Sequence, residues 1–425
     1  MHLPTLTAAA VCLSAAVTAL AGSARQSSPL RVLDQPFAVS ELQQLTLAAR
    51  TPSGQPQLAV DHSGRVAVSW LERIGNGPRH AFKYAFREGL RWSSPRTIVE
   101  RDDFFVNWAD VPSIFPLAQT GRWVAHWLQK NGSGTYAYDV RIAASDRDAT
   151  TWSEGRLPYS DASQSEHGFA SFFDLNGKTG VTWLDGREMA ASSASSGTGH
   201  EGHTQGAMTL RTAVIQPDGI IGTDMRLDAR VCECCPTAAV ATASGALVAY
   251  RDRSDDEIRD IAVLRLEKGK WLGPTYVHAD RWKIAACPVN GPALAALGDR
   301  VALAWFTAEG DSPRALLAFS TDGGRSFGPP IRVDDVQTLG RVDVVMLADG
   351  RAVVSWLEFV EQGSELRARI IAPDGRRSAH FTITASSADR QSGYARMVNS
   401  GNDLVFAWTS TRPALQIKTA VLTVQ

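Results

Sequence analysis

The feature that most constrains this fold is a repeat that runs through the whole chain. An apolar run, a turn with Gly or polar residues, a second apolar run and an aromatic residue recur seven times, as in QLAVDHSGRVAVSW. The aromatic residues that end the copies are Trp70, Trp127, Trp183, Tyr250, Trp305, Trp356 and Trp408. Each copy has the pattern of a β-hairpin. Because a lone hairpin cannot bury its apolar face, the copies must stack on one another.

The spacing of the copies predicts the architecture. The aromatic landmarks are 51 to 67 residues apart, which leaves room for about four strands in each period. Such a period is typical of a β-propeller, in which blades surround a central channel. We therefore expect an all-β propeller of seven four-stranded blades, or six if one hairpin is an insertion. Because the repeat runs from end to end, residues 22–425 are expected to form a single domain.

The two ends of the repeat predict how the ring closes. The seventh copy ends with LQIKTAVLTVQ and leaves no residues for a fourth strand. The segment LRVLDQPFAV, residues 30–39, resembles the fourth-strand segment PPIRVDD of the fifth repeat. We expect this N-terminal strand to complete the last blade, because closure removes an exposed sheet edge.

The N-terminus predicts export. Residues 5–21 are uncharged and apolar, and they end in Ala19-Leu20-Ala21, an A-x-A-like cleavage site. We expect residues 1–21 to be a signal peptide and the mature protein to be periplasmic or extracellular, with an uncleaved anchor as the alternative. No later segment is long and apolar enough to span a bilayer, so no membrane span is expected in the mature chain.

The charge balance argues against one class of partner. The chain has 43 Lys and Arg against 44 Asp and Glu, a formal net charge of −1. Nucleic-acid-binding proteins usually have a basic patch or stripe. We therefore expect a glycan, another small ligand or an exported protein partner, and no nucleic acid.

Propeller geometry predicts where a site should lie. Residues that precede the innermost strands and residues that follow the second strands open on one face, around the channel. Pairs of Arg and acidic residues cluster there in the third and fourth repeats, which favours a site at that end. The polar residues expected at this end are Asp110, Glu166, His167, Asp185, Arg187, Arg251, Arg253, Asn290, Arg341 and Tyr394.

Cysteines give the sharpest local signal. The sequence CECCP contains Cys232, Cys234 and Cys235, and Cys287 precedes Pro288 at the equivalent point of the next repeat. Four cysteines in an exported chain predict two disulfides, with three possible connectivities. A bond between the adjacent Cys234 and Cys235 is disfavoured on geometric grounds.

A metal site is the alternative to the disulfides. His200 and His203 form an H-x-x-H pattern in a long loop of the third repeat, and His167 begins the same repeat. Thiolate and imidazole together suit copper or zinc, and thiolate favours Cu(I). No standard zinc motif has this spacing. A redox-active set of thiols is a third possibility.

One turn motif links the chain to a family. The segment STDGGRSF matches the pattern S-x-D-x-G-x-x-[WF], with Ser320, Asp322, Gly324 and Phe327 at the fixed positions. Its role is structural: Asp322 can accept backbone N–H groups, Gly324 supplies an unusual φ, and Phe327 packs beneath the turn. With this motif the chain resembles the Asp-box (BNR), sialidase-like propeller superfamily.

The resemblance implies a glycan-acting site, but some of its parts are missing. Sialidases have an arginine clamp, a nucleophilic tyrosine and an aspartate acid/base. SGYARM places Tyr394 where the family has its nucleophile, and Arg251, Arg253 and Arg341 are candidates for the clamp. The segment NGPAL, which begins at Asn290, is similar to a Gly-Pro turn of some sialidases. The Arg of the family's Arg-Ile-Pro segment is absent from residues 54–58, and the loop LERIGNGPRH lacks the acid.

The leading hypothesis is therefore an exported, sialidase-like propeller that binds a ligand or metal, and not a conventional sialidase. Its site would be the channel end of the third to fifth repeats. The binding residues would be Asp185, Arg187, Arg251, Arg253, Asn290, His167, His200, His203 and the four cysteines. A sialidase-type glycoside hydrolase with Tyr394, Asp185, Arg251 and Arg341 as catalytic residues is the alternative. A structural interaction scaffold is the second alternative.

Overall fold

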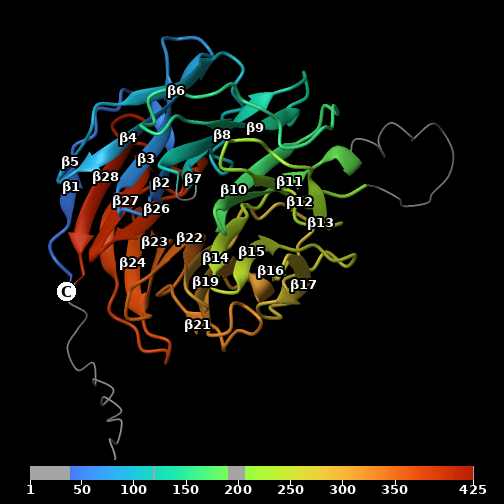
Figure 1. Cartoon of the computed structure of the whole chain (residues 1–425). Coiled ribbons are helices and arrows are strands. Elements are labelled where there is room, and N and C mark those ends of the chain that lie inside the picture. Colours follow the sequence, from blue (N-terminus) through green and yellow to red (C-terminus); the bar gives the residue numbers. More distant parts are fainter. Residues whose placement is uncertain (1–38, 118–119, 190–205, 425) are drawn as a thin grey trace, which may run out of the picture. The chain divides into compact units, whose positions relative to one another are not determined.

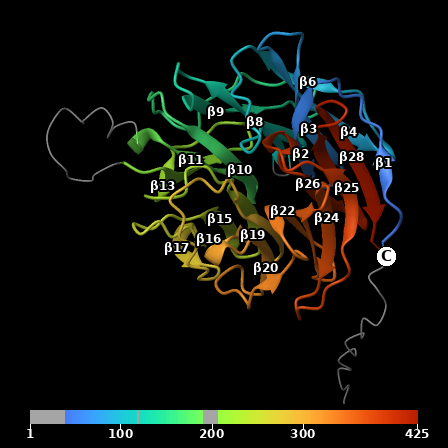
Figure 2. The ribbon, with the colours of Figure 1, turned by 180° about the vertical axis from the view of Figure 1, so that it is seen from behind.

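Seven antiparallel sheets are arranged in a ring in the computed structural model (Figure 1). The structure describes residues 39–117, 120–189 and 206–424, which belong to one unit that begins at Pro36. Viewed from behind, the sheets follow one another around the ring in sequence order (Figure 2). The predicted seven-bladed propeller is confirmed.

Each blade is assembled from consecutive strands, and only the seventh combines the two ends of the chain. Blade 1 contains β2 (Ser53–Val60), β3 (Val66–Arg73), β4 (His80–Glu88) and β6 (Arg96–Arg101), with β5 (Arg91–Trp92) beside β4. Blade 2 contains β7 (Ser113–Leu117), β8 (Arg122–Lys130) and β9 (Tyr138–Ala144). Blade 3 contains β10 (His167–Leu175), β11 (Lys178–Asp185), β12 (Thr209–Ile215) and β13 (Met225–Asp228). Blade 4 contains β14 (Ala238–Thr242), β15 (Gly245–Arg251), β16 (Ile261–Glu267) and β17 (Lys270–Tyr276).

The remaining blades follow the same plan. Blade 5 contains β18 (Ala293–Leu297), β19 (Arg300–Thr307), β20 (Arg314–Ser320) and β21 (Ile331–Arg332). Blade 6 contains β22 (Thr338–Met346), β23 (Ala352–Val360), β24 (Gly363–Ile371) and β25 (Phe381–Ser386). Blade 7 contains β26 (Arg396–Ser400), β27 (Asp403–Ser410), β28 (Gln416–Thr423) and β1 (Gln43–Leu45). Two short 3-10 turns, η1 (Glu309–Asp311) and η2 (Arg390–Ser392), precede β20 and β26.

Blade 2 departs from the four-strand plan. Its fourth position holds two isolated bridges, Ile142 with Arg156 and Ser145 with Trp152, instead of a continuous strand. Trp152 packs against the core between blades 1 and 2. The outer edge of this blade is therefore covered, although its pairing is interrupted.

The ring closes through the N-terminal segment, as expected, but with different residues. Strand β1 pairs antiparallel with β28, with Gln43 opposite Val421. Val39 forms a further bridge with Val424. The expected closing strand, residues 30–39, lies outside the described residues apart from Val39. Closure places both strands in one sheet and satisfies the edge that β28 would otherwise expose.

The landmark aromatic residues explain how the blades hold together. Trp183 and Trp356 have no exposed surface, and each donates its indole N–H to the acid two residues later in the chain. Trp183 Nε1 lies 2.8 Å from Asp185 Oδ2, and Trp356 donates to Glu358. A buried indole N–H needs such a partner, because an unpaired polar group is costly in the core.

The innermost strand of every blade lines a central cavity of about 390 Å³. These strands are β2, β7, β10, β14, β18, β22 and β26, and they surround the centre of the ring in Figure 1. The end of the channel at which they begin is called the mouth below. At the mouth, β10 and β22 begin with bulges, and Phe169 and Arg341 take positive φ values of 54° and 51° there. Bulges of this kind re-aim side chains at the start of a strand.

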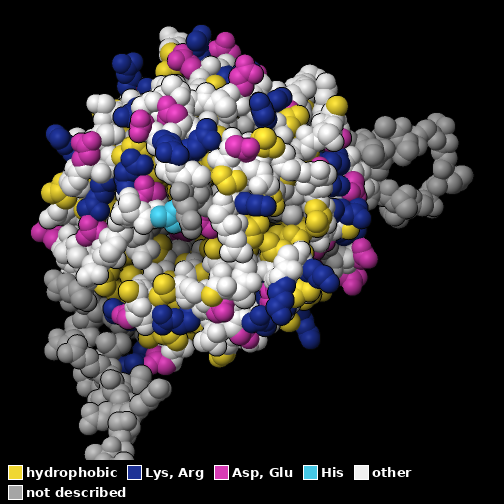
Figure 3. Space-filling model, viewed as in Figure 1, with side chains coloured by type: hydrophobic (Ala, Val, Ile, Leu, Met, Phe, Trp, Pro, Cys, Tyr) yellow, Lys and Arg dark blue, Asp and Glu magenta, His cyan; other side chains and the backbone are white. Residues whose placement is uncertain are grey.

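Charged side chains are distributed without segregation by sign on the face shown in Figure 3, where Lys and Arg are interspersed with Asp and Glu. No helix among the described residues is long and apolar enough to cross a bilayer.

Candidate functional site

Three cysteine sulfurs lie together at the mouth. Cys232 Sγ is 3.1 Å from Cys235 Sγ and 3.9 Å from Cys234 Sγ, and the three atoms all lie within 4.8 Å of one another. Cys287, from the segment before β18, forms a hydrogen bond with Cys234. The structure thus brings together the four cysteines that the sequence places before adjacent innermost strands.

The four cysteines differ in exposure. Cys232 and Cys235 are each 1% exposed, Cys234 is half-buried, and Cys287 is exposed. All four are unbridged thiols in the structure. The Cys232 and Cys235 sulfurs would have to approach to about 2.05 Å to form a disulfide, so both the metal and the disulfide alternatives start from this cluster.

The surroundings favour a negative charge on Cys232. Hydrogen bonds from Cys234 and Cys235 hold the pKa of the Cys232 thiol well below its usual range, against the effect of burial. Arg259 Nη1 also donates to the Cys232 sulfur at 3.3 Å. The hydrogen bond from Cys234 lowers the pKa of Cys287 to about 7. Thiolates are the form of cysteine that binds metals and attacks electrophiles.

Two arginines and two glutamates brace the cysteine loop. Arg259 bonds to Glu233 at 2.9 Å and to Glu257 at 2.8 Å. Arg253 bonds to Glu257 at 2.6 Å and also to Glu233. The guanidinium of Arg253, expected to bind a ligand, is therefore paired with carboxylates on both sides.

A pair of carboxyl groups lies beside the thiols. The Tyr138 hydroxyl is 2.8 Å from Asp110 Oδ2 and 3.0 Å from Glu166 Oε1. Burial raises the pKa of Asp110 to about 7 and that of Glu166 to about 8. The charges of Asp110 and Cys287 add to the shift of Glu166, which places the carboxyl pair within electrostatic range of the cysteine cluster.

Gly168 is required by this arrangement. A Cβ at this position would lie 2.0 Å from Asp110 Oδ2 and 2.6 Å from the Tyr138 hydroxyl. The next residue, Phe169, donates its backbone N–H to Asp110 Oδ1 at 2.8 Å. The sequence analysis placed Asp110 and Glu166 at the mouth but missed Tyr138, which begins a third strand. The glycine directly after Glu166-His167 was the available signal.

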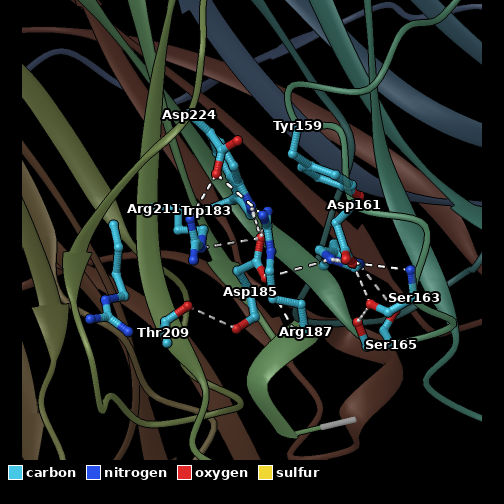
Figure 4. Close-up of polar contacts among 12 residues, drawn as sticks. Tyr159, Asp161, Ser163, Ser165, Trp183, Asp185, Arg187, Thr209, Arg211 and Asp224 are labelled. Atoms are coloured by element: carbon cyan, nitrogen blue, oxygen red, sulfur yellow. Dashed lines mark hydrogen bonds and ion pairs between the residues drawn. The ribbon is translucent and has the colours of Figure 1, made fainter. Parts of the chain in front are cut away.

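Asp185 and Arg187 form the centre of a polar network in blade 3 (Figure 4). Arg187 donates to both carboxylate oxygens of Asp185, at 2.7 and 2.6 Å, and Trp183 donates to the same group. Burial alone would raise the pKa of Asp185, but the hydrogen bonds from Arg187 hold it below its usual value. Arg187 also lies 3.4 Å from Asp224. These partners fix the loop after β11.

His167 belongs to this same network. Its ring has no exposed surface and stacks on Tyr159, with centroids 4.4 Å apart. Its Nε2 atom lies 3.5 Å from Asp161 Oδ2 and 3.6 Å from Asp185 Oδ1. Within the described residues, the metal-like group of sulfurs includes no histidine. His200 and His203 lie outside the described residues.

Arg251 and Asn290 are occupied by the backbone. Arg251, which is 1% exposed, donates to the carbonyl oxygens of Asn290, Arg259 and Phe306 at 2.9, 2.6 and 2.7 Å. The Asn290 side chain donates to the Leu339 carbonyl and accepts the backbone N–H of Arg341. Both residues thereby tie blade 4, blade 5 and blade 6 together.

Arg341 and Tyr394 are also inward-facing. Arg341 donates to Ser392 Oγ at 2.8 Å and to the Gly393 carbonyl at 3.0 Å. The Tyr394 hydroxyl donates to the Val289 carbonyl at 2.7 Å, and burial raises its pKa. Tyr394 lines the channel cavity with a ring that is 3% exposed. The structure therefore places the phenol against backbone, without a carboxylate base among these contacts.

The Ser320–Phe327 turn lies between β20 and β21, as expected for its structural role. Asp322 accepts the Ser320 hydroxyl at 2.7 Å and the Ser326 backbone N–H at 3.0 Å. Gly324 has a φ of 84° and donates to Ser320 Oγ, and Phe327 packs against the core of blades 4 and 5. Asp146 makes the equivalent contact with the Thr150 N–H in blade 2.

Comparisons with known proteins identify the fold. No family model and no curated protein sequence matches this chain. Among solved structures, the polysaccharide lyase Uly1 has a TM-score of 0.55 at 9% identity, covering 93% of this chain and 94% of that one. A Dyadobacter fermentans protein of unknown function has a TM-score of 0.50 at 11% identity, covering 91% and 99%. An α-L-arabinofuranosidase, Arb93A of Fusarium graminearum, has a TM-score of 0.48 at 13% identity, covering 91% and 98%. At these identities the likeness indicates a shared propeller fold.

Proposed function

We propose that this protein is an exported propeller that binds a soft metal ion, copper or zinc, through cysteine thiolates at the mouth. The observation that carries the proposal is the group of three sulfurs, all within 4.8 Å of one another. Thiolates are preferred ligands of Cu(I) and Zn(II). The hydrogen bond from Arg259 to Cys232 favours the ionised form that a ligand needs.

The contacts of the expected catalytic residues support a binding role over glycoside hydrolysis. Tyr394 bonds to a backbone carbonyl, and Arg251 and Arg341 bond to backbone carbonyl groups across the blades. Asp185 is held as a carboxylate by Arg187. A general acid needs a raised pKa, and the pKa of Asp185 is lowered.

Native mass spectrometry tests this proposal. The mature protein, purified from its export compartment without reductant, is compared with protein reduced under anaerobic conditions and incubated with Cu(I) or Zn(II). We expect one metal ion per chain in the wild type and none in the Cys232→Ser and Cys235→Ser variants, with folding checked by circular dichroism. Tyr394→Phe is the control and should bind metal as the wild type does.

Other outcomes would replace the proposal. A mass about four units below the reduced chain, with no metal taken up after reduction, would assign the cysteines to two disulfides. Turnover of a sialoside substrate that disappears in Tyr394→Phe would assign the protein to the sialidase-type hydrolases.

A further inference from the structure

The cysteine cluster has an inside and an outside. Cys232 and Cys235 are each 1% exposed, so a metal ion in solution cannot reach them directly. Cys234 is half-buried and close to Cys232, with the two sulfurs 3.9 Å apart. Cys287 is exposed and hydrogen-bonds to Cys234. The four sulfurs thus form a graded path from the surface to the buried pair.

The number of clustered donors distinguishes the inner site from the outer thiol. Cys232, Cys234 and Cys235 form the close group, and Cys287 is not part of it within the described residues. Structural zinc sites are almost always tetrahedral, with four protein ligands. Soft thiolate sets select Cu(I), and three sulfurs on one side of a buried pocket provide a complete low-coordinate set.

Resting on the proposed function, we propose that the inner three cysteines hold Cu(I) and that Cys287 is the exchange ligand through which the ion enters from a thiol donor. Cys287 first displaces one donor thiol from the ion. Cys234 then takes the ion from Cys287, and Cys232 and Cys235 complete its coordination. Each protein thiol that becomes a ligand gives up its proton, and each displaced donor thiolate accepts one. The copper remains Cu(I) throughout, so no oxidant or reductant is needed.

The surroundings of Cys287 allow such a docking step. The residues before it, Ala285 and Ala286, are exposed and have small side chains. Arg281 and Lys283 are exposed in the same segment. A donor that carries carboxylates beside its thiol therefore meets positive charge and little steric hindrance, which suits a thiol-bearing peptide or protein with an acidic face.

The test separates uptake from affinity. Reduced protein is mixed with Cu(I)–glutathione under anaerobic conditions, and uptake is followed by stopped-flow absorbance in the thiolate-to-copper band. Equilibrium affinity is measured by competition with a chromogenic Cu(I) chelator. In Cys287→Ser we expect unchanged affinity and uptake slowed by about 10-fold or more, because access governs thiol exchange. In Cys235→Ser and Cys234→Ser we expect affinity to fall by about 100-fold.

The two proposals fail in different ways. If the wild type binds Cu(I) but Cys287→Ser loses affinity as Cys235→Ser does, Cys287 is a fourth ligand and the exchange role is wrong. Uptake at the wild-type rate in Cys287→Ser would overturn it equally. X-ray absorption of the copper-loaded protein should give three sulfur neighbours, and four would contradict the inference. If no variant and no wild type binds Cu(I), the metal-binding function itself fails.

Discussion

The Tyr138 hydroxyl lies 2.8 Å from Asp110 Oδ2, where blades 2 and 3 meet at the mouth. The same oxygen is 3.0 Å from Glu166 Oε1, yet a phenol has only one hydrogen to donate. The second contact is a hydrogen bond only if one of the two carboxyls is protonated. Because burial raises the pKa of both acids to about 7 and about 8, the three side chains hold a shared proton near neutral pH.

The shared proton predicts that Asp110→Asn changes how stability depends on pH. A carboxyl whose pKa is raised by folding binds its proton more tightly in the folded chain. The free energy of unfolding therefore falls as pH rises from the unfolded value near 4 to the folded value of about 7. Asparagine can accept the Phe169 N–H and donate to Tyr138, so it mimics the protonated acid.

Urea unfolding at pH 5 and pH 9 measures this effect. Relative to the wild type, Asp110→Asn should gain about 1 kcal/mol or more of unfolding free energy on going from pH 5 to pH 9. Asp148→Asn, at an exposed position, is the control and should follow the wild type. Parallel pH profiles for Asp110→Asn and the wild type would contradict the shared proton.

Gly168→Ala should be strongly destabilising, because the new Cβ would lie 2.0 Å from Asp110 Oδ2 and 2.6 Å from the Tyr138 hydroxyl. We expect a loss of about 2–3 kcal/mol in unfolding free energy, typical of overpacking in a rigid site. Gly77→Ala is the matched control, since a Cβ there has nothing within 4 Å. Equal unfolding midpoints for the two variants would show that the carboxyl pair can move apart cheaply.

Much of the fold could be predicted from the sequence, because each blade repeats one hairpin with one buried aromatic landmark. The closing strand was located too early, at residues 30–39, because apolar character was used to find it. The strand that pairs with Val421 begins at Gln43 and has only one buried residue, Leu45. Its position is fixed by pairing with β28, which local sequence does not encode.

The site was predictable where residues act through their position in the repeat. Cys235 and Cys287 each precede a proline at the start of adjacent innermost strands, and their segments do meet. The roles of Arg251 and Arg341 could not be read in the same way. Arg251 donates to the carbonyls of Asn290 and Phe306, which belong to the next blade. A buried arginine of this kind has the same local sequence as one that faces a ligand.

Glu358 predicts a large structural effect at a position where the sequence suggested only a charged strand end. Its carboxylate accepts the Trp356 indole N–H and the backbone N–H groups of Val336 and Gln337, at 2.8 and 3.1 Å. Glu358→Ala would leave these buried donors unpaired, so we expect a loss of about 3 kcal/mol in unfolding free energy. Glu361→Ala, at an exposed position, should be within about 0.5 kcal/mol of the wild type. A small effect at Glu358 would mean that water replaces the carboxylate.

Alkylation of the reduced, metal-free protein tests the gradation of the four thiols. Iodoacetamide should modify the exposed Cys287 first and the half-buried Cys234 next, whereas Cys232 and Cys235 should react only as the protein unfolds. Because the hydrogen bond from Cys234 lowers the pKa of Cys287 to about 7, its reaction rate should rise with pH through a midpoint near that value. In Cys234→Ala that hydrogen bond is lost, so the midpoint should move upward, toward that of an ordinary thiol near 8.5. Peptide mass spectrometry at a series of pH values gives both the order and the midpoints. Modification of Cys232 before Cys287 under native conditions would contradict the buried site.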